Sequence, residues 1–252
     1  MNRLRSPVLA SQRDLVIVTK VGTDRSAKPP RKRFDASFLR EAVERSRERL
    51  KRDVIEVVLL HNPSLRGMER PGAVEALIEL KEKKQIRAWG VSAGSLEVAR
   101  AGLARGAEVL ELAHNAFHRH ELRGLADELA TNKAGILARS VLAYGLLSGH
   151  WPTTKQFPRG DHRRERWTPD ELKKRISQLN ALRPSVTGGV ASLRAAALRF
   201  VLANPAVSSA ILGPRSMLQL DQLVREAGND PYFTPEALSA LESRLDAAGI
   251  RS

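Results

Sequence analysis

Short runs of β-branched and aliphatic residues alternate with longer segments whose apolar positions repeat with a helical period. The short runs are typical of buried parallel strands, and the longer segments are typical of amphipathic helices. This regular succession predicts βα units around a parallel sheet. The predicted strands are Leu15–Lys20, Val54–His61, Ile86–Val91, Glu108–Leu112, Gly135–Ser140 and Val207–Leu212. The predicted helices are Ala36–Leu50, Gly72–Lys84, Leu96–Arg105, Glu121–Lys133, Val190–Ala203, Met217–Glu226 and Pro235–Ala247.

Polar residues recur where the predicted strands end, at Lys20, His61, Ser92, Ser140 and Arg215. A doubly wound dinucleotide-binding sheet would carry G-x-G-x-x-G after a strand, and no strand here is followed by that motif. Chemistry spread over the carboxyl ends of several parallel strands is typical of a TIM-type (β/α)8 barrel. We therefore expect an α/β barrel that forms one domain over residues 1–252.

The composition narrows the possible chemistry. The 252 residues include 42 Lys+Arg and 28 Asp+Glu, a net charge of +14, and no Cys, which excludes disulfides, Cys-ligated zinc and cysteine nucleophiles. No apolar run is long enough for a membrane span and no secretory signal opens the chain, so a soluble, cytoplasmic protein is expected. The basic stretch 31–52 carries compensating acids such as Glu44 and Glu48, which favours a solvated helix face with internal ion pairs over a nucleic-acid surface.

Lys20 and His61 close consecutive predicted strands. Taken alone, Lys20 is explained by an exposed lysine at a strand end, and His61 by a histidine hydrogen-bonded in the turn that Asn62 and Pro63 make. Taken together, the two residues place a cation and a neutral hydrogen-bond donor on one face of the sheet.

The segment Gly213-Pro214-Arg215-Ser216 lies between the last strand and the helix that begins near Met217. Free backbone N–H groups and a guanidinium there predict a phosphate-binding site. The alternative is a tight turn with a surface arginine.

His114, His118 and His120 cluster in AHNAFHRH. Metal sites need converging ligands, and no carboxylate at a helical spacing completes one, so we expect no metal. The longest irregular stretch is 145–169, and loops of that length are usually functional lids or disordered segments.

Five segments resemble the aldo-keto reductases in family order. The resemblance implies a barrel that binds NADPH (NADP) across its carboxyl-terminal face and reduces an aldehyde or ketone to an alcohol by direct hydride transfer. The segments are LVIVTKVG, LLHNPS, IRAWGVS, LARSVLAYGLLSG and LRFVLANPAVSSAILGPRSMLQLDQL.

The resemblance implies that Lys20 and His61 are the catalytic lysine and histidine. The family's Asp and Tyr precede the lysine strand and have no counterpart, because only nineteen residues precede Lys20. The first two βα units of the barrel are therefore expected to be absent, which explains six predicted strands instead of eight. An incomplete barrel exposes edges at the first and last strands and favours self-association.

The resemblance also implies a cofactor site that favours NADP over NAD, because its arginine, Arg215, is similar to the one that binds the 2′-phosphate. Near the nicotinamide, Ala93 replaces an Asn and Glu111 replaces a Gln, which weakens the nicotinamide contacts. The implied cofactor-binding residues are Ser92, Arg139, Ser140, Leu142, Gly213, Arg215, Ser216 and Gln219.

The sequence leaves three alternative functions open. The first is an NADP-dependent carbonyl reductase acting on a small molecule, whose true chain starts upstream of Met1. The second is a catalytically impaired, naturally shortened relative that acts as a dinucleotide-binding or interaction protein. The third is a basic nucleic-acid-binding protein on a barrel scaffold, which the compensating acids of the Arg-rich segments disfavour.

Overall fold

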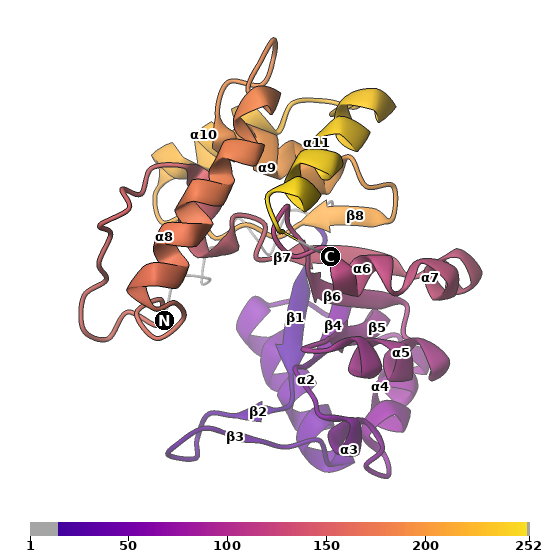
Figure 1. Cartoon of the computed structure of the whole chain (residues 1–252). Helices are drawn as coiled ribbons and strands as arrows, with labels where there is room; N and C mark the ends of the chain where they lie inside the picture. The colour runs from indigo at the N-terminus through magenta and orange to yellow at the C-terminus, as the bar shows by residue number, and fades with distance from the viewer. Residues whose placement is uncertain (1–14, 251–252) are drawn as a thin grey trace. The chain divides into compact units, whose positions relative to one another are not determined.

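The structure is a computed structural model that describes residues 15–250. Its parallel sheet has the strand order β1-β4-β5-β6-β7-β8, so each strand follows its predecessor along the chain as in a TIM-type barrel (Figure 1). The chain divides into two compact units, each described by itself below. The first unit is Met1–Leu112 with Gly124–Ile136, and the second is Ala113–Arg123 with Leu137–Ser252.

The first unit is built on four parallel strands: β1 (Val18–Val21), β4 (Ile55–His61), β5 (Ile86–Ser92) and β6 (Val109–Ala113), of which only the last residue belongs to the second unit. Leu59 and Leu60 are fully buried, which agrees with a strand covered on both faces. The register pairs Leu59 with Gly90, and Gly90 with Val109. A Cβ at Gly90 would overlap the carbonyl oxygen of Val109, so glycine is required where β5 and β6 approach.

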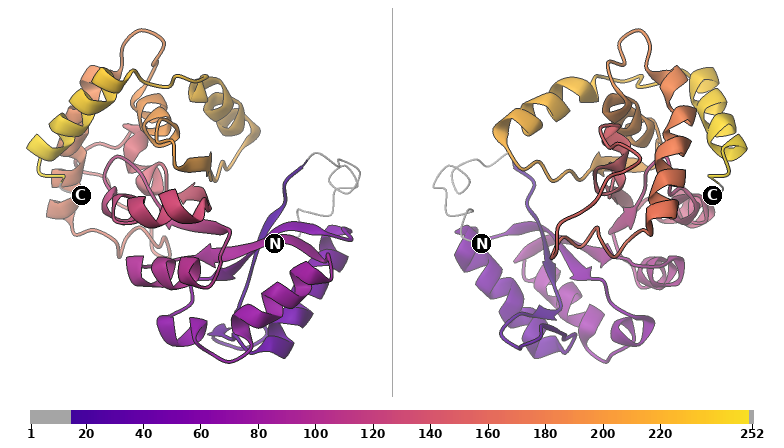
Figure 2. Two further views of the ribbon diagram at one scale, coloured as in Figure 1. Left: turned by 90° about the vertical axis from the view of Figure 1, so that its right-hand side faces the viewer. Right: turned by 60° about the vertical axis from the view of Figure 1, so that its left-hand side comes forward.

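Helices α2 (Ala36–Leu50) and α4 (Ala73–Glu82) lie side by side against these strands (Figure 2). Asp35 caps α2 by accepting a hydrogen bond from Phe38 N at 3.1 Å. The solvated face of α2 carries the predicted internal ion pairs, Arg45 with Glu41 and Arg47 with Glu44. The unit also contains α3 (Leu65–Met68), α5 (Leu96–Ala104), α7 (Ala126–Asn132), and a hairpin of β2 (Thr23–Asp24) and β3 (Arg31–Lys32).

The second unit packs helices around β7 (Gly135–Arg139), which begins in the first unit, and β8 (Val207–Ala210). Its central helix is α9 (Leu193–Leu202), whose Leu198, Phe200 and Val201 lie in the core. The other elements are α6 (His120–Arg123), α8 (Pro169–Gln178), α10 (Met217–Ala227), α11 (Pro235–Ala247), and the 3-10 segments η1 (Ala143–Ser148), η2 (Leu179–Ala181) and η3 (Arg183–Ser185).

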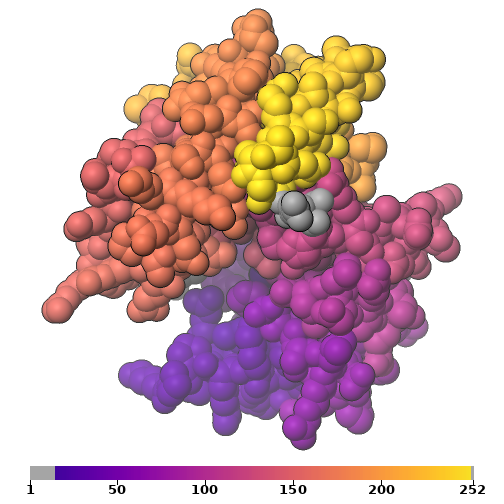
Figure 3. All heavy atoms as spheres, in the orientation of Figure 1, coloured from indigo at the N-terminus to yellow at the C-terminus, as the bar shows by residue number. Residues whose placement is uncertain are grey.

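The C-terminal part of the chain (yellow) lies against the orange region in Figure 3. Two hydrogen bonds connect α11 and the residue after it to the end of α8 and to η2: Gln178 Nε2 donates to Ala248 O at 2.9 Å, and Arg244 Nε donates to Ala181 O at 3.2 Å. This packing encloses Leu241 and Leu245, which are fully buried.

All six predicted strands are confirmed. The single predicted helix Glu121–Lys133 is wrong, because the chain leaves helical geometry at 124–125 and forms α6 and α7 instead. Helix α8 was not predicted. None of the helices among residues 15–250 is long and apolar enough to cross a bilayer. A single domain over 1–252 and self-association through the end strands β1 and β8 stay predictions.

Candidate functional site

A buried carboxylate pairs with the predicted catalytic lysine in the first unit. Lys20 Nζ lies 2.7 Å from Glu111 Oε2, and Ser92 Oγ donates to Glu111 Oε1 at 2.9 Å. The Glu111 side chain is 4% exposed, whereas that of Lys20 is 32% exposed. The ammonium therefore neutralises a carboxylate that has no access to bulk water, and it keeps part of its own surface open to a ligand.

The register of β4, β5 and β6 brings His61, Ser92 and Glu111 together. Residues at corresponding positions of neighbouring parallel strands form a row across the sheet, and here His61 pairs with Ser92 and Ser92 pairs with Glu111. The row lies at the carboxyl ends of β4 and β5. The resemblance places Ser92 and Glu111 near the nicotinamide, which stays a prediction, and in the structure both residues lie beside Lys20.

His61 is held from the hairpin that no sequence pattern predicted. Its Nδ1 lies 3.2 Å from Thr23 Oγ1, and Lys32 Nζ donates to His61 O at 2.6 Å and to Thr23 Oγ1 at 3.2 Å. Burial lowers the pKa of His61, and the positive charges of Lys32 and Lys20 lower it further. His61 is therefore a neutral imidazole at pH 7, suited to donate a hydrogen bond.

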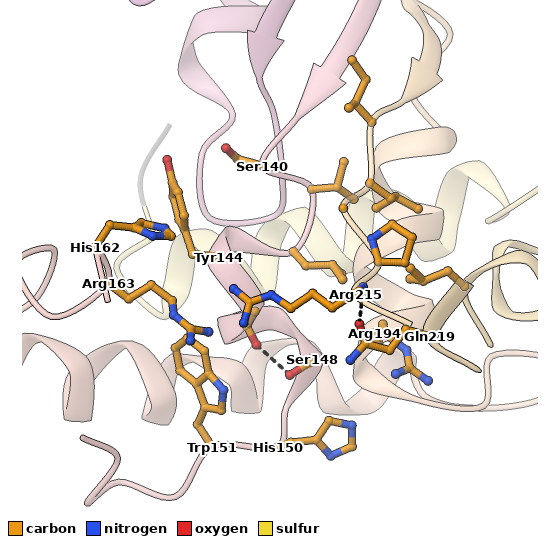
Figure 4. Close-up of a pocket in the computed structure, with 18 residues that line it drawn as sticks. Ser140, Tyr144, Ser148, His150, Trp151, His162, Arg163, Arg194, Arg215 and Gln219 are labelled. Atoms are coloured by element: carbon orange, nitrogen blue, oxygen red, sulfur yellow. Dashed lines mark hydrogen bonds between the residues drawn. The ribbon is translucent and has the colours of Figure 1, made fainter. Parts of the chain in front are cut away.

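The second unit contains a pocket of about 570 Å³ (Figure 4). It lies where β7 and β8 lead into η1 and α10, and five of the predicted cofactor-binding residues line it. These are Ser140, Leu142, Gly213, Arg215 and Gln219. Trp151 of the long loop also lines the pocket, as its place in that loop suggested. The lining residues that the sequence did not indicate come from η1, from the loop after it and from α9, namely Tyr144, Ser148, His150, His162, Arg163 and Arg194.

Arg215 differs from the other two arginines of the pocket. Arg163 is paired with Asp161 at 2.5 Å, and Arg194 is paired with Glu226 at 2.5 Å. Within residues 15–250, Arg215 makes no ion pair, and its side chain extends across the pocket toward Tyr144 and Ser148 (Figure 4). An unpaired guanidinium in a concave site is suited to a phosphate or carboxylate.

The turn around Arg215 is fixed by Gln219. The backbone N–H of Arg215 donates to Gln219 Oε1 at 2.8 Å, and Gln219 N donates to Ser216 Oγ at 3.2 Å. Ser216 is thus the N-cap of α10 and does not line the pocket. Arg215 is exposed, as the alternative of a tight turn with a surface arginine predicts. It also lines the pocket, which that alternative does not predict.

The opposite wall has an unusual backbone. Ser140, Ala143 and Tyr144 have φ angles of 59°, 43° and 61°, a left-handed conformation that costs side-chain-bearing residues energy. Asn115 Nδ2 donates to Ser140 O at 2.9 Å and holds the first of these residues. Arg139 precedes the turn and does not line the pocket, and its carbonyl accepts from His114 N at 3.1 Å.

The long stretch 145–169 contributes the apolar wall that its aromatic residues suggest. Trp151 lines the pocket and packs edge-on against Phe157 and Trp167, with ring centroids 5.1 and 6.1 Å away. The guanidinium of Arg166 lies 3.6 Å from the ring centroid of Tyr144. These contacts fix the aromatic rings in the wall of a cavity large enough for part of a dinucleotide.

The expectation that no carboxylate completes the histidine cluster is wrong. His118 and His120 meet Glu121, and one ligand atom of each lies within 4.8 Å of the others. Glu121 lies three residues after His118, a spacing that places two side chains on the same face of a helical turn.

Comparisons with known proteins agree with this architecture. The sequence model of the Aldo/keto reductase family matches residues 6–244. The uncharacterized oxidoreductase YqkF of Bacillus subtilis (strain 168) is 26% identical over 91% of this chain and 74% of its own length. L-galactose dehydrogenase of Arabidopsis thaliana is 24% identical over 84% of this chain and 63% of its own length.

Two solved structures share the fold. The holo form of aldo-keto reductase AKR11C1 from Bacillus halodurans matches with a TM-score of 0.75 and 21% identity over 93% of this chain and 74% of that one. Glycerol dehydrogenase AKR11B4 from Gluconobacter oxydans matches with a TM-score of 0.80 and 23% identity over 93% and 73%. The predicted α/β fold of TIM-barrel type is thereby confirmed.

Proposed function

Because the chain belongs to the aldo/keto reductase family, we propose that it binds NADP(H) in the pocket of its second unit and reduces the carbonyl group of a small aldehyde or ketone. The observation that carries this proposal is Arg215, the arginine of the pocket that has no carboxylate partner among residues 15–250. It selects an anionic ligand, and the 2′-phosphate distinguishes NADP from NAD.

The residues of the pocket fit a dinucleotide. A Cβ at Gly213 would meet no atom within 4 Å, so the backbone beside Arg215 is open to a ligand. The first turn of α10 adds unpaired N–H groups and the positive end of a helix dipole. The aromatic wall with Trp151 offers a flat apolar surface to the rings of a nucleotide.

Lys20 and His61 supply the chemistry at the carbonyl oxygen. When bound, the nicotinamide would supply the hydride. As negative charge develops on the oxygen, the Lys20 ammonium donates a proton to it, because 32% of the Lys20 side chain stays exposed beside Glu111. The neutral imidazole of His61 orients the same oxygen by a hydrogen bond. Glu111 provides the carboxylate that is paired with the lysine.

A second candidate function is dinucleotide binding without turnover. The specific observation is that the first unit contains no tyrosine, since the two tyrosines of the chain are Tyr144 and Tyr232. Within that unit, the proton would have to come from Lys20.

Steady-state NADPH oxidation with a panel of small aldehydes and ketones tests the proposal. Lys20→Met should lower kcat by about 100-fold or more while the Kd for NADPH stays within about 2-fold. Lys173→Met, at an exposed position of α8, is the matched control. Equal rates for the two variants would contradict the role of Lys20. Saturable NADPH binding without turnover by the wild type would favour the second candidate.

A further inference from the structure

Three potential metal ligands meet at the start of α6 in the second unit. His118 Nε2 lies 3.5 Å from Glu121 Oε2, and the rings of His118 and His120 have centroids 4.3 Å apart with an interplanar angle of 70°. One ligand atom from each of the three residues lies within 4.8 Å of the other two. Their positions are fixed by backbone structure, because His118 pairs with Asn115 in a β-bridge and His120 begins α6.

Two of these ligand atoms are buried without a hydrogen-bond partner among residues 15–250. They are Glu121 Oε2 and His118 Nε2, and the Glu121 side chain is only 10% exposed. A buried carboxylate oxygen that accepts no hydrogen bond is costly, and such atoms in native proteins usually have a water or an ion as partner. The two unpartnered atoms face each other, so a single bound cation would satisfy both.

The neighbouring arginines form ion pairs with carboxylates other than Glu121, although Nε and Nη1 of Arg119 also lack a hydrogen-bond partner among residues 15–250. Arg119 is paired with Asp246 at 2.5 Å and also donates to Ile250 O, and Arg123 is paired with Glu242 at 2.7 Å. Both acidic partners lie on α11, whereas Glu121 faces the imidazole of His118.

We propose that His118, His120 and Glu121 bind a divalent transition-metal ion, with Zn²⁺ as the probe. Two imidazole nitrogens and one carboxylate oxygen are typical zinc ligands, and three protein ligands leave a fourth position for water. At zinc–ligand distances of about 2.0–2.1 Å, tetrahedral ligands lie about 3.4 Å apart, so modest side-chain rotations from the observed arrangement are enough. The two nitrogen ligands disfavour Mg²⁺ and Ca²⁺, which prefer oxygen.

Metal binding at this position braces the segment that holds the pocket wall. The β-bridge links His118 to Asn115, and Asn115 Nδ2 holds the carbonyl of Ser140. Zn²⁺ that binds the folded unit and not the unfolded chain raises the free energy of unfolding by mass action. Metal binding is independent of catalysis, because the proposed reaction assigns no role to His118, His120 or Glu121.

Isothermal titration of the EDTA-treated, re-dialysed chain with Zn²⁺ tests the proposal. We expect one Zn²⁺ per chain and a Kd that rises about 10- to 100-fold in both His118→Ala and Glu121→Gln. His150→Ala is the matched control and should keep the wild-type affinity. The absence of saturable binding, or equal affinities in all four proteins, would overturn the proposal.

Co²⁺ gives a second readout that does not depend on the variants folding. Bound to the wild-type chain, Co²⁺ should show the intense visible absorption of a four-coordinate ion, and Zn²⁺ should displace it. A weak six-coordinate spectrum would contradict the proposed ligand set. Glu121→Gln is nearly isosteric, so its circular dichroism in EDTA should match the wild type and separate lost binding from lost folding.

Discussion

Removing Lys20 and removing the charge of Glu111 should have unequal effects on stability. The substitution Lys20→Met removes the ammonium from a carboxylate that is only 4% exposed and that accepts a hydrogen bond from Ser92 Oγ. The substitution Glu111→Gln instead leaves a lysine with about a third of its side chain in solvent, where water replaces the lost partner. The difference in burial of the two partners therefore predicts which single variant is the less stable.

The burial of Lys20 and Glu111 determines how much free energy of unfolding each variant loses. Breaking a fully buried pair by removing one partner costs about 3–5 kcal/mol. Partial exposure of Lys20 lets water approach Glu111 in its absence, so we expect a loss of about 2–3 kcal/mol for Lys20→Met. Glu111→Gln keeps an acceptor for the Ser92 hydroxyl, so we expect a loss of about 1 kcal/mol. The double variant should resemble Glu111→Gln, a coupling of about 2 kcal/mol.

Urea unfolding at pH 7, followed by far-UV circular dichroism, measures all four proteins. The double variant should be more stable than Lys20→Met, since it no longer contains a buried Glu111 carboxylate without the Lys20 ammonium. Additive losses in the two single variants, or an equal loss in both, would refute the assignment of Glu111 as the buried partner of Lys20.

Two further predictions concern stability. Gly90→Ala should destabilise the chain by about 3 kcal/mol in urea unfolding, because the new Cβ overlaps Val109 O. The control Gly189→Ala, whose Cβ meets no atom closer than 3.7 Å, should have little effect. Equal effects of the two substitutions would contradict the close approach of β5 and β6. Burial, with the charge of His118, lowers the pKa of His114 from 6.5 to about 4. The unfolded chain therefore binds the proton first, and stability should fall by about 3 kcal/mol as pH drops from 6.5 to 4. His114→Phe should remove this part of the pH dependence in EDTA-containing buffer, and an unchanged pH profile would show that His114 titrates normally.

The strands were predictable because parallel strands buried on both faces are continuous aliphatic runs. Val58, Leu59 and Leu60 are all fully buried in β4. Helix α8 was not predicted because most of its residues are polar and Leu172 is its buried apolar residue. Its start was nevertheless encoded by the capping box of Thr168 with Glu171, which follows the ordinary rule for helix N-termini.

The candidate site was predictable only where local position decides it. Lys20 and His61 were identified because residues at the ends of parallel strands lie on one edge of the sheet. The pairing of Lys20 with Glu111 depends on three-dimensional register, and Lys32 reaches His61 through a hairpin whose strands have two residues each. Neither contact leaves a periodic signal in the sequence.

The histidine cluster was incompletely predicted. Glu121 follows His118 at i+3, a helical spacing, and it contacts the cluster of His118 and His120 in the structure. The spacing alone was therefore enough to identify this carboxylate.

A fluorescence titration of the chain with NADPH and with NADH measures the proposed cofactor binding. We expect saturable binding that favours NADPH by about 10- to 100-fold, since a charged hydrogen bond to phosphate contributes about 1.5–3 kcal/mol. Arg215→Ala should abolish that preference, and Arg225→Ala, which removes an exposed arginine paired with Asp221 on the same helix, should keep it. Equal affinity for the two cofactors, or an equal loss in both variants, would contradict the account.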